Sequence, residues 1–193
     1  TPQRRDGHHP ILQLQLGPAR FIIDPKTQAA AQDFDHKLIV RDTDFRLSGG
    51  TTNAGIQTIY SELVQDERRN QLIPDDVVQA LEQGRSPILL TERREHVEYF
   101  AERQRGLVRN LIILQGGMKT KDRRAAIEQL TTIPEAEERL VVATGRFIGE
   151  GFDDARLDTL FLAMPVSWKG TLVQYGGRLQ RRRRSKSDVR RFE

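Results

Sequence analysis

Four residues near the C-terminal end of the chain have types and spacing suited to phosphate chemistry. Gln174, Gly177, Arg178 and Arg181 form the pattern Gln-x-x-Gly-Arg-x-x-Arg. The two arginines are three positions apart, so on a helix both guanidinium groups would lie on one face. Such a pair can hold a phosphate from two sides, and arginine keeps its charge at any physiological pH. A solvated basic helix face is the alternative, and these residues alone do not exclude it.

A second candidate site is the loop "TGRFIGEGFD" at residues 144–153. Thr144 stands where a predicted strand ends, and Glu150, Gly151 and Asp153 precede the next strand. Glycines let a backbone approach a phosphate or a ribose closely. Asp153 could accept a hydrogen bond from a ribose hydroxyl or hold an arginine. The alternative is a flexible connection with turn glycines, but the arginine motif that follows favours a phosphate site.

The positive charge of the chain is concentrated at its C-terminal end. The net charge is +4, and residues 178–193 contribute eight basic and two acidic side chains, a net +6. The other 177 residues therefore sum to −2. A near-neutral body does not favour a protein that binds nucleic acid through a broad basic face. Arg182, Arg183 and Arg184 lie beyond the spaced motif and are as well explained by a solvated turn.

The composition indicates a soluble globular protein. Hydrophobic residues make up 37% and charged residues 30% of the 193 residues, and there is no cysteine. Disulfides and thiolate metal sites are thereby excluded, and a cytoplasmic location is expected. No apolar run approaches the roughly 20 residues that span a bilayer. Asp6, His8 and His9 are weak metal-ligand candidates without a suitably spaced partner, so no metal site is predicted.

The elements that must position these sites alternate along the chain. Apolar residues at helical spacing predict a helix around 56–64 and a second helix that follows Pro74 and stops at Gly84. Four short apolar segments predict strands: "PILLT", "NLIILQ", "RLVVAT" and "LDTLFLAMP". Helices are also predicted around Val97 and Phe100 and in "KDRRAAIEQL". Alternating strands and helices imply a mainly parallel sheet with helices on both faces, in which ligands bind beyond the C-terminal ends of the strands.

The first 50 residues follow a different pattern and are predicted as a separate segment. "ILQLQLGPARFII" alternates apolar and polar residues around a Gly-Pro turn, which predicts a β-hairpin. "HKLIVRDTDF" predicts another short strand. Residues 1–50 are thus expected to form a linker with a small β-rich segment, and residues 51–193 the α/β domain.

The ordered set of motifs resembles the second motor domain of superfamily-two helicases, the DEAD/DEAH-type translocases. "ATGRFIGEGFDDARLDTLFLAMPVSWKGTLVQYGGRLQR" is similar to their motifs V, Va and VI, and "SPILLTERREHVEYF" to motif IV. "LIILQGGMKTKDRRAAIEQL" resembles the strand, loop and helix that follow motif IV. The wording "GEGFD" is similar to that of restriction-type, type III-like members. The resemblance covers nearly everything from Gln57 onward and implies a RecA-like fold.

The resemblance implies roles for individual residues. Arg178 and Arg181 would be arginine fingers facing the γ-phosphate of ATP, with Gln174 near the attacking water. Glu150, Gly151, Asp153 and Gly177 would contact the nucleotide. A nucleic-acid backbone, DNA rather than RNA, would be held by four further residues: Thr91, Arg93, Gly116 and Thr144.

Two departures from the family pattern limit what the chain could do alone. Neither a Gly-x-x-x-x-Gly-Lys-Ser/Thr phosphate loop nor an acidic Asp-Glu box occurs in the sequence. ATP and Mg²⁺ would therefore be bound mainly by an N-terminal RecA-like domain of the same protein, and Thr1-Pro2 resembles the end of that domain's motif III. The alternative function is a non-catalytic nucleic-acid-binding α/β module with a basic C-terminus.

Overall fold

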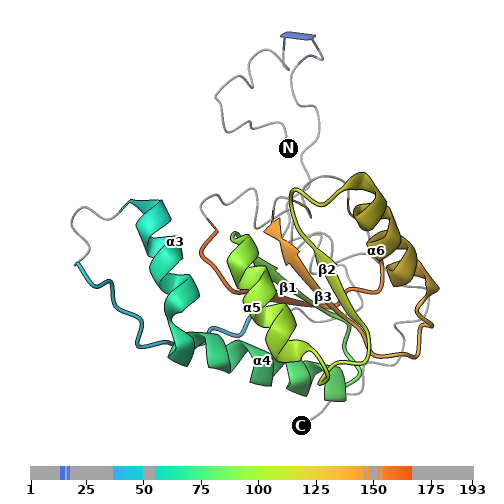
Figure 1. The fold of residues 1–193 in the computed structure, drawn as a ribbon, viewed down its shortest axis with the longest axis horizontal. Coiled ribbons are helices and arrows are strands. Elements are labelled where there is room, and N and C mark those ends of the chain that lie inside the picture. Colours follow the sequence, from blue (N-terminus) through green and yellow to red (C-terminus); the bar gives the residue numbers. More distant parts are fainter. Residues whose placement is uncertain are drawn as a thin grey trace. The chain divides into compact units, whose positions relative to one another are not determined.

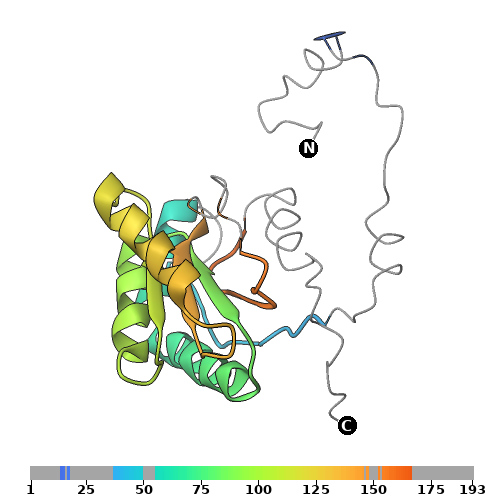
Figure 2. The same ribbon diagram turned by 90° about the vertical axis from the view of Figure 1, so that its right-hand side faces the viewer.

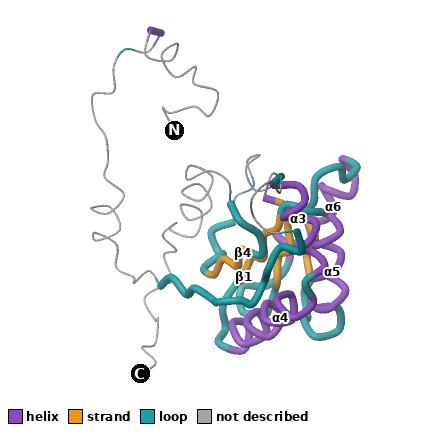
Figure 3. Tube along the Cα trace, turned by 90° about the vertical axis from the view of Figure 1, so that its left-hand side faces the viewer, coloured by secondary structure: helices purple, strands orange, loops and turns teal. Residues whose placement is uncertain are grey.

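The computed structural model describes residues 14, 15, 17, 37–49, 55–145, 147, 152 and 154–166. The chain divides into two compact units, one formed by residues 43–186 and the other by residues 1–42 and 187–193. The fold described below belongs to the first unit; Figure 1 labels its elements except β4, which is labelled in Figure 3. The elements are α3 (Ile56–Gln65), α4 (Glu67–Glu82), β1 (Pro87–Thr91), α5 (Arg94–Gln104), β2 (Leu111–Leu114), α6 (Thr120–Thr132), β3 (Leu140–Thr144) and β4 (Thr159–Leu162).

The four strands form one parallel sheet in the order β2-β3-β1-β4. β1 and β3 are buried along their whole length, because they occupy the centre of the sheet and carry apolar side chains on both faces. β4 pairs with β1, beside which it runs in Figure 3. All four predicted strands are therefore confirmed, and so is their parallel arrangement.

Helices cover both faces of the sheet, as predicted. On one face Leu89 and Val142 pack with Val77 of α4 and Phe100 of α5. The alternate strand residues point to the other face, where Leu130 of α6 belongs to the second core cluster. α6 is drawn in yellow and orange in Figure 2. The two-residue period of each strand thus divides its side chains between two hydrophobic layers.

α4 differs from its prediction, because it starts two turns earlier than Pro74. The Asp66 side chain accepts a hydrogen bond from the Arg69 backbone N–H at 3.1 Å and so caps the helix. Pro74 lies inside the helix, in a buried row with Asn70 and Val77. Packing of this row against the sheet offsets the hydrogen bond that a proline cannot donate. The helix ends near Gly84, where φ is +71°, as the sequence predicts.

The segment before α3 also differs from its prediction. Residues 37–45 form no strand, and Leu38, Ile39 and Val40 are exposed. Of the predicted hairpin, Leu14 and Gln15 are helical instead of extended, and the Leu14 side chain is 86% exposed. Most of the hairpin lies outside the described residues.

Candidate nucleic-acid interface

The C-terminal ends of three strands bring several predicted residues to one edge of the sheet. Thr91 at the end of β1 is the register partner of Thr144 at the end of β3. Leu114 of β2 pairs with Ala143, so the turn at Gly116 and Gly117 follows at the same edge. The Gly116 N–H donates to the Thr144 hydroxyl oxygen at 3.1 Å. Thr91, Gly116 and Thr144 therefore lie together at the ends of β1, β2 and β3, the three strands labelled in Figure 1.

The Thr91 side chain is buried and takes part in a hydrogen-bonded chain with His96 and Asn70. Thr91 Oγ1 lies 2.9 Å from His96 Nδ1, and His96 Nε2 lies 3.0 Å from Asn70 Oδ1. Asn70 Nδ2 donates to the Val64 carbonyl at 2.7 Å, which fixes the direction of the amide. His96 therefore donates from Nε2 and accepts the Thr91 hydroxyl proton at Nδ1. The Thr91 hydroxyl proton is used inside the domain.

His96 is neutral in the folded domain. Burial, and then the positive charge of Arg69, lower its pKa from 6.5 to about 3. The ring is fully buried and lies 4.3 Å, centroid to centroid, from the ring of Phe100. A protonated imidazole could not accept the hydrogen bond from Thr91. The neutral ring is thus what holds the end of β1 to α4 and α5.

Arg69 extends this network to the segment that follows β4. Its Nη1 donates to Asn70 Oδ1 at 3.2 Å, and its Nη2 donates to the Ala163 carbonyl. Burial lowers the pKa of Arg69. Two residues later, the Pro165 carbonyl accepts a hydrogen bond from the Tyr60 hydroxyl of α3 at 3.1 Å. The helices before β1 therefore fix the chain where it leaves β4 and approaches the predicted arginine motif.

Arg93 is held by α3. Its Nη2 donates to Gln57 Oε1 at 2.8 Å and to the Gln57 carbonyl at 3.2 Å. Its Nε is buried and has no hydrogen-bond partner among the described residues. Arg93 therefore joins α3 to the loop between β1 and α5.

Both sides of the loop predicted to contact nucleotide are anchored in the core. Phe147 and Phe152 are buried in the cluster on the α6 side of the sheet. Asp154 forms an ion pair with buried Arg139, with 2.6 Å between Oδ2 and Nη1. The residues between and around these anchors that the resemblance assigns to ATP lie outside the described residues: Glu150, Gly151 and Asp153, with Gln174, Gly177, Arg178 and Arg181 further on.

The sequence analysis missed the three polar residues behind the strand ends, Arg69, Asn70 and His96. His96 could have been suspected, because it follows Thr91 by five residues on a predicted helix. No sequence pattern indicated a role for Asn70 or Arg69, since their partners His96 and Ala163 lie 26 and 94 residues away.

The described residues contain neither a metal-binding group nor a helix that could span a membrane. They contain no group of three or more His, Asp or Glu side chains that could hold a metal ion. Asp6, His8 and His9 lie outside the described ranges. None of the described helices is both long and apolar enough to cross a membrane.

No family model matches the chain. Over 127 residues, 64% of the chain, it is 31% identical to a transcript termination protein of monkeypox virus and to one of ectromelia virus, and it covers 25% of each. The chain thus spans about a quarter of the length of these curated relatives. It matches the crystal structure of T4 UvsW with a TM-score of 0.54 and 16% identity, covering 66% of this chain and 26% of that one.

The match to T4 UvsW confirms the predicted fold. The chain has an all-parallel α/β sheet of the RecA-like type that the resemblance to the C-terminal domain of superfamily-two helicases implied.

Proposed function

We propose that this chain is the second motor domain of an ATP-dependent helicase or translocase that acts on nucleic acid, DNA rather than RNA. The observation that carries the proposal is the meeting of Thr91, Gly116 and Thr144 at one edge of a RecA-like sheet. In parallel α/β sheets this edge is where ligands bind. The relatives are named transcript termination proteins, which supports work on a nucleic acid.

The proposed contacts with nucleic acid are independent of base sequence. Thr91, Arg93, Gly116 and Thr144 would shape the edge along which the sugar-phosphate backbone runs. Phosphate contacts fix the position of a strand, and they weaken as salt concentration rises. Such a grip suits an enzyme that must move along any sequence.

The proposed catalytic contribution is completion of an ATP site that another domain begins. Arg178 and Arg181 would stabilise negative charge on the transferred phosphoryl group, and Gln174 would orient the attacking water. Glu150, Gly151, Asp153 and Gly177 would contact the nucleotide. Bound Mg²⁺ would neutralise phosphate charge. Closure of the two motor domains on ATP and their reopening after hydrolysis would move the nucleic-acid contacts of one domain relative to those of the other.

The arginine-finger assignment is tested in the complete protein that contains this chain. Arg181→Ala is expected to lower nucleic-acid-stimulated ATP hydrolysis by about 10³-fold or more, because arginine fingers contribute on that order in related phosphoryl-transfer enzymes. Nucleic-acid binding measured by fluorescence anisotropy should change little. Arg183→Ala removes the same charge two residues away and serves as the control. Hydrolysis near the wild-type rate in Arg181→Ala would disprove the assignment.

A further inference from the structure

The donors of the predicted nucleic-acid residues are largely used inside the domain. The Thr91 hydroxyl donates to His96, the Gly116 N–H donates to Thr144, and Arg93 Nη2 donates to Gln57. A backbone phosphate at this edge therefore needs a cation that is still available. Arg94, the first residue of α5, is exposed, and no ion pair among the described residues involves it.

The Arg94 guanidinium lies against the backbone of Gly117. A Cβ atom added to Gly117 would be 2.7 Å from Arg94 Cζ and 2.9 Å from its Nη1, closer than side chains pack. Gly117 also has a φ of +82°, which glycine adopts at no steric cost. The backbone turn thus favours glycine at this position, and a side chain added there would displace the Arg94 guanidinium.

The strand order shows which parts of the sheet edge the contact between Arg94 and Gly117 brings together. Arg94 follows β1 and Gly117 follows β2, and β3 lies between these strands. The contact between the Arg94 guanidinium and Gly117 therefore joins two segments whose strands are not neighbours in the sheet. It places the guanidinium beside the turn in which the Gly116 N–H donates to Thr144 of β3. A cation thus lies at the turn that the proposed function assigns to the nucleic-acid backbone.

We propose that Arg94, held across the Gly116–Gly117 turn, is the side chain with which this domain contacts a backbone phosphate of a bound nucleic-acid strand. This inference rests on the proposed function and assigns the contact to a residue to which the resemblance gave no role. The planar guanidinium can donate two parallel hydrogen bonds to phosphate oxygens. Arg93, its neighbour, acts as a positioning residue by tying the loop to α3.

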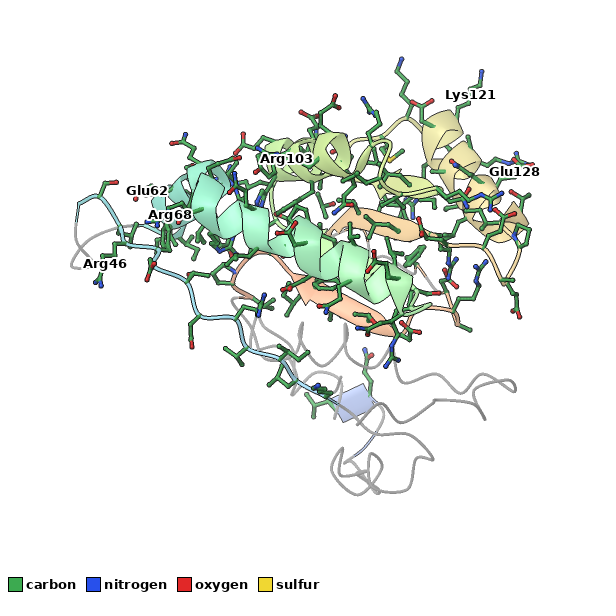
Figure 4. All side chains as sticks on the ribbon, turned by 90° about the horizontal axis from the view of Figure 1, so that it is seen from below. Arg46, Glu62, Arg68, Arg103, Lys121 and Glu128 are labelled. Atoms are coloured by element: carbon green, nitrogen blue, oxygen red, sulfur yellow. The ribbon has the colours of Figure 1, made fainter. Side chains whose placement is uncertain are left out.

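Positively charged side chains near the Gly116–Gly117 turn suit the binding of a polyanion. Lys119 and Lys121 follow the turn at the start of α6, and both are exposed. Neither forms an ion pair among the described residues, and Figure 4 shows Lys121 projecting outward from the helix. Successive phosphates of one strand could meet Arg94 and then these lysines. A single nucleotide would not need cations from both α5 and the start of α6.

The first test measures binding of a labelled single-stranded DNA to the complete protein over a series of salt concentrations. Arg94→Gln is expected to weaken binding about tenfold, the size of one lost hydrogen-bonded charge contact. It should also reduce the slope of log K against log salt by about 0.7, as loss of one phosphate contact does for a single strand. Arg94→Lys should recover the slope, and Arg85→Gln, which removes an exposed arginine before β1 at the opposite edge of the sheet, should leave it unchanged.

The second test uses two glycines with the same backbone conformation. Gly117 and Gly106 have φ of +82° and +84°, but only Gly117 has a side chain where its Cβ would stand. Alanine at either position should lower thermal stability similarly. Only Gly117→Ala should weaken DNA binding, and combining it with Arg94→Gln should add nothing further.

The outcomes separate this inference from the proposed function. Salt-sensitive DNA binding by the wild-type protein that Arg94→Gln leaves unchanged would overturn only the Arg94 assignment. Weakened binding of ATP instead of DNA in Arg94→Gln would overturn it as well, since the phosphate would then belong to the nucleotide. A wild-type protein without salt-sensitive DNA binding would count against the proposed function itself and the inference with it.

Discussion

His96 is a buried residue whose ionisation changes strongly on folding. Its pKa is about 3 in the folded domain, whereas an exposed histidine has a pKa of 6.5. Between these pH values the unfolded chain binds a proton that the folded domain does not bind. The free energy of unfolding should therefore fall as pH falls from about 6.5 toward 3, by at most about 1.4 kcal/mol per pH unit from this residue.

The contribution of His96 can be isolated with His96→Gln, which stays neutral at every pH. Chemical denaturation at pH 7 and pH 4 should show a smaller loss of stability on acidification in the variant than in the wild type. Carboxylates titrate in both proteins, so their contribution cancels in the comparison. An equal loss in both proteins would show that His96 accepts a proton in the folded domain.

At the scale of elements, α4 shows how a cap decides where a helix begins. Pro74 suits the first turn of a helix, and the sequence around it predicts a start there. The structure starts the helix at Glu67, because Asp66 caps it and the buried row of Asn70, Pro74 and Val77 packs along its whole length. The earlier turns carry Arg69 and Asn70, on which the network behind Thr91 depends.

Loss of the cap should destabilise the domain. Asp66→Ala is expected to lower the free energy of unfolding by about 1 kcal/mol, the usual cost of removing an N-cap side chain. Asp75→Ala is the matched control, because Asp75 is an exposed carboxylate in the same helix that makes no hydrogen bond or ion pair with another described residue. Equal effects of the two changes in urea denaturation would mean that α4 does not depend on its cap.

At the scale of the whole molecule, the proposed motor needs two domains. The sequence contains no Gly-x-x-x-x-Gly-Lys-Ser/Thr loop to cradle ATP phosphates. The 193-residue chain by itself should therefore show no Mg²⁺-dependent ATP hydrolysis above background, with or without nucleic acid. Addition of a phosphate-loop motor domain from the same protein should restore hydrolysis that depends on Arg181. Robust turnover by the isolated chain would refute the division of labour proposed for the two domains.

The pattern of apolar residues along the chain predicts the sheet and the residues at the edge where its strands end. Short apolar strands alternating with amphipathic helices allow few arrangements other than a parallel sheet covered on both faces. In such a sheet all strand ends meet at one edge, so Thr91, Gly116 and Thr144 could be placed together from their positions in the chain. The spacing of apolar residues predicts these features, because that spacing is a local property of each strand and helix.

Which of these side chains remain available to a ligand depends on tertiary packing. Arg93 and Arg94 are adjacent and chemically identical in the sequence. One is held by Gln57, 36 residues earlier, and the other lies across Gly117 at the end of a strand two places away in the sheet. Hydrogen-bond partners far apart in sequence are chosen by how helices pack on the sheet, and no local pattern records that choice. The neutral state of His96 and the course of α4 through Pro74 depend on the same long-range packing.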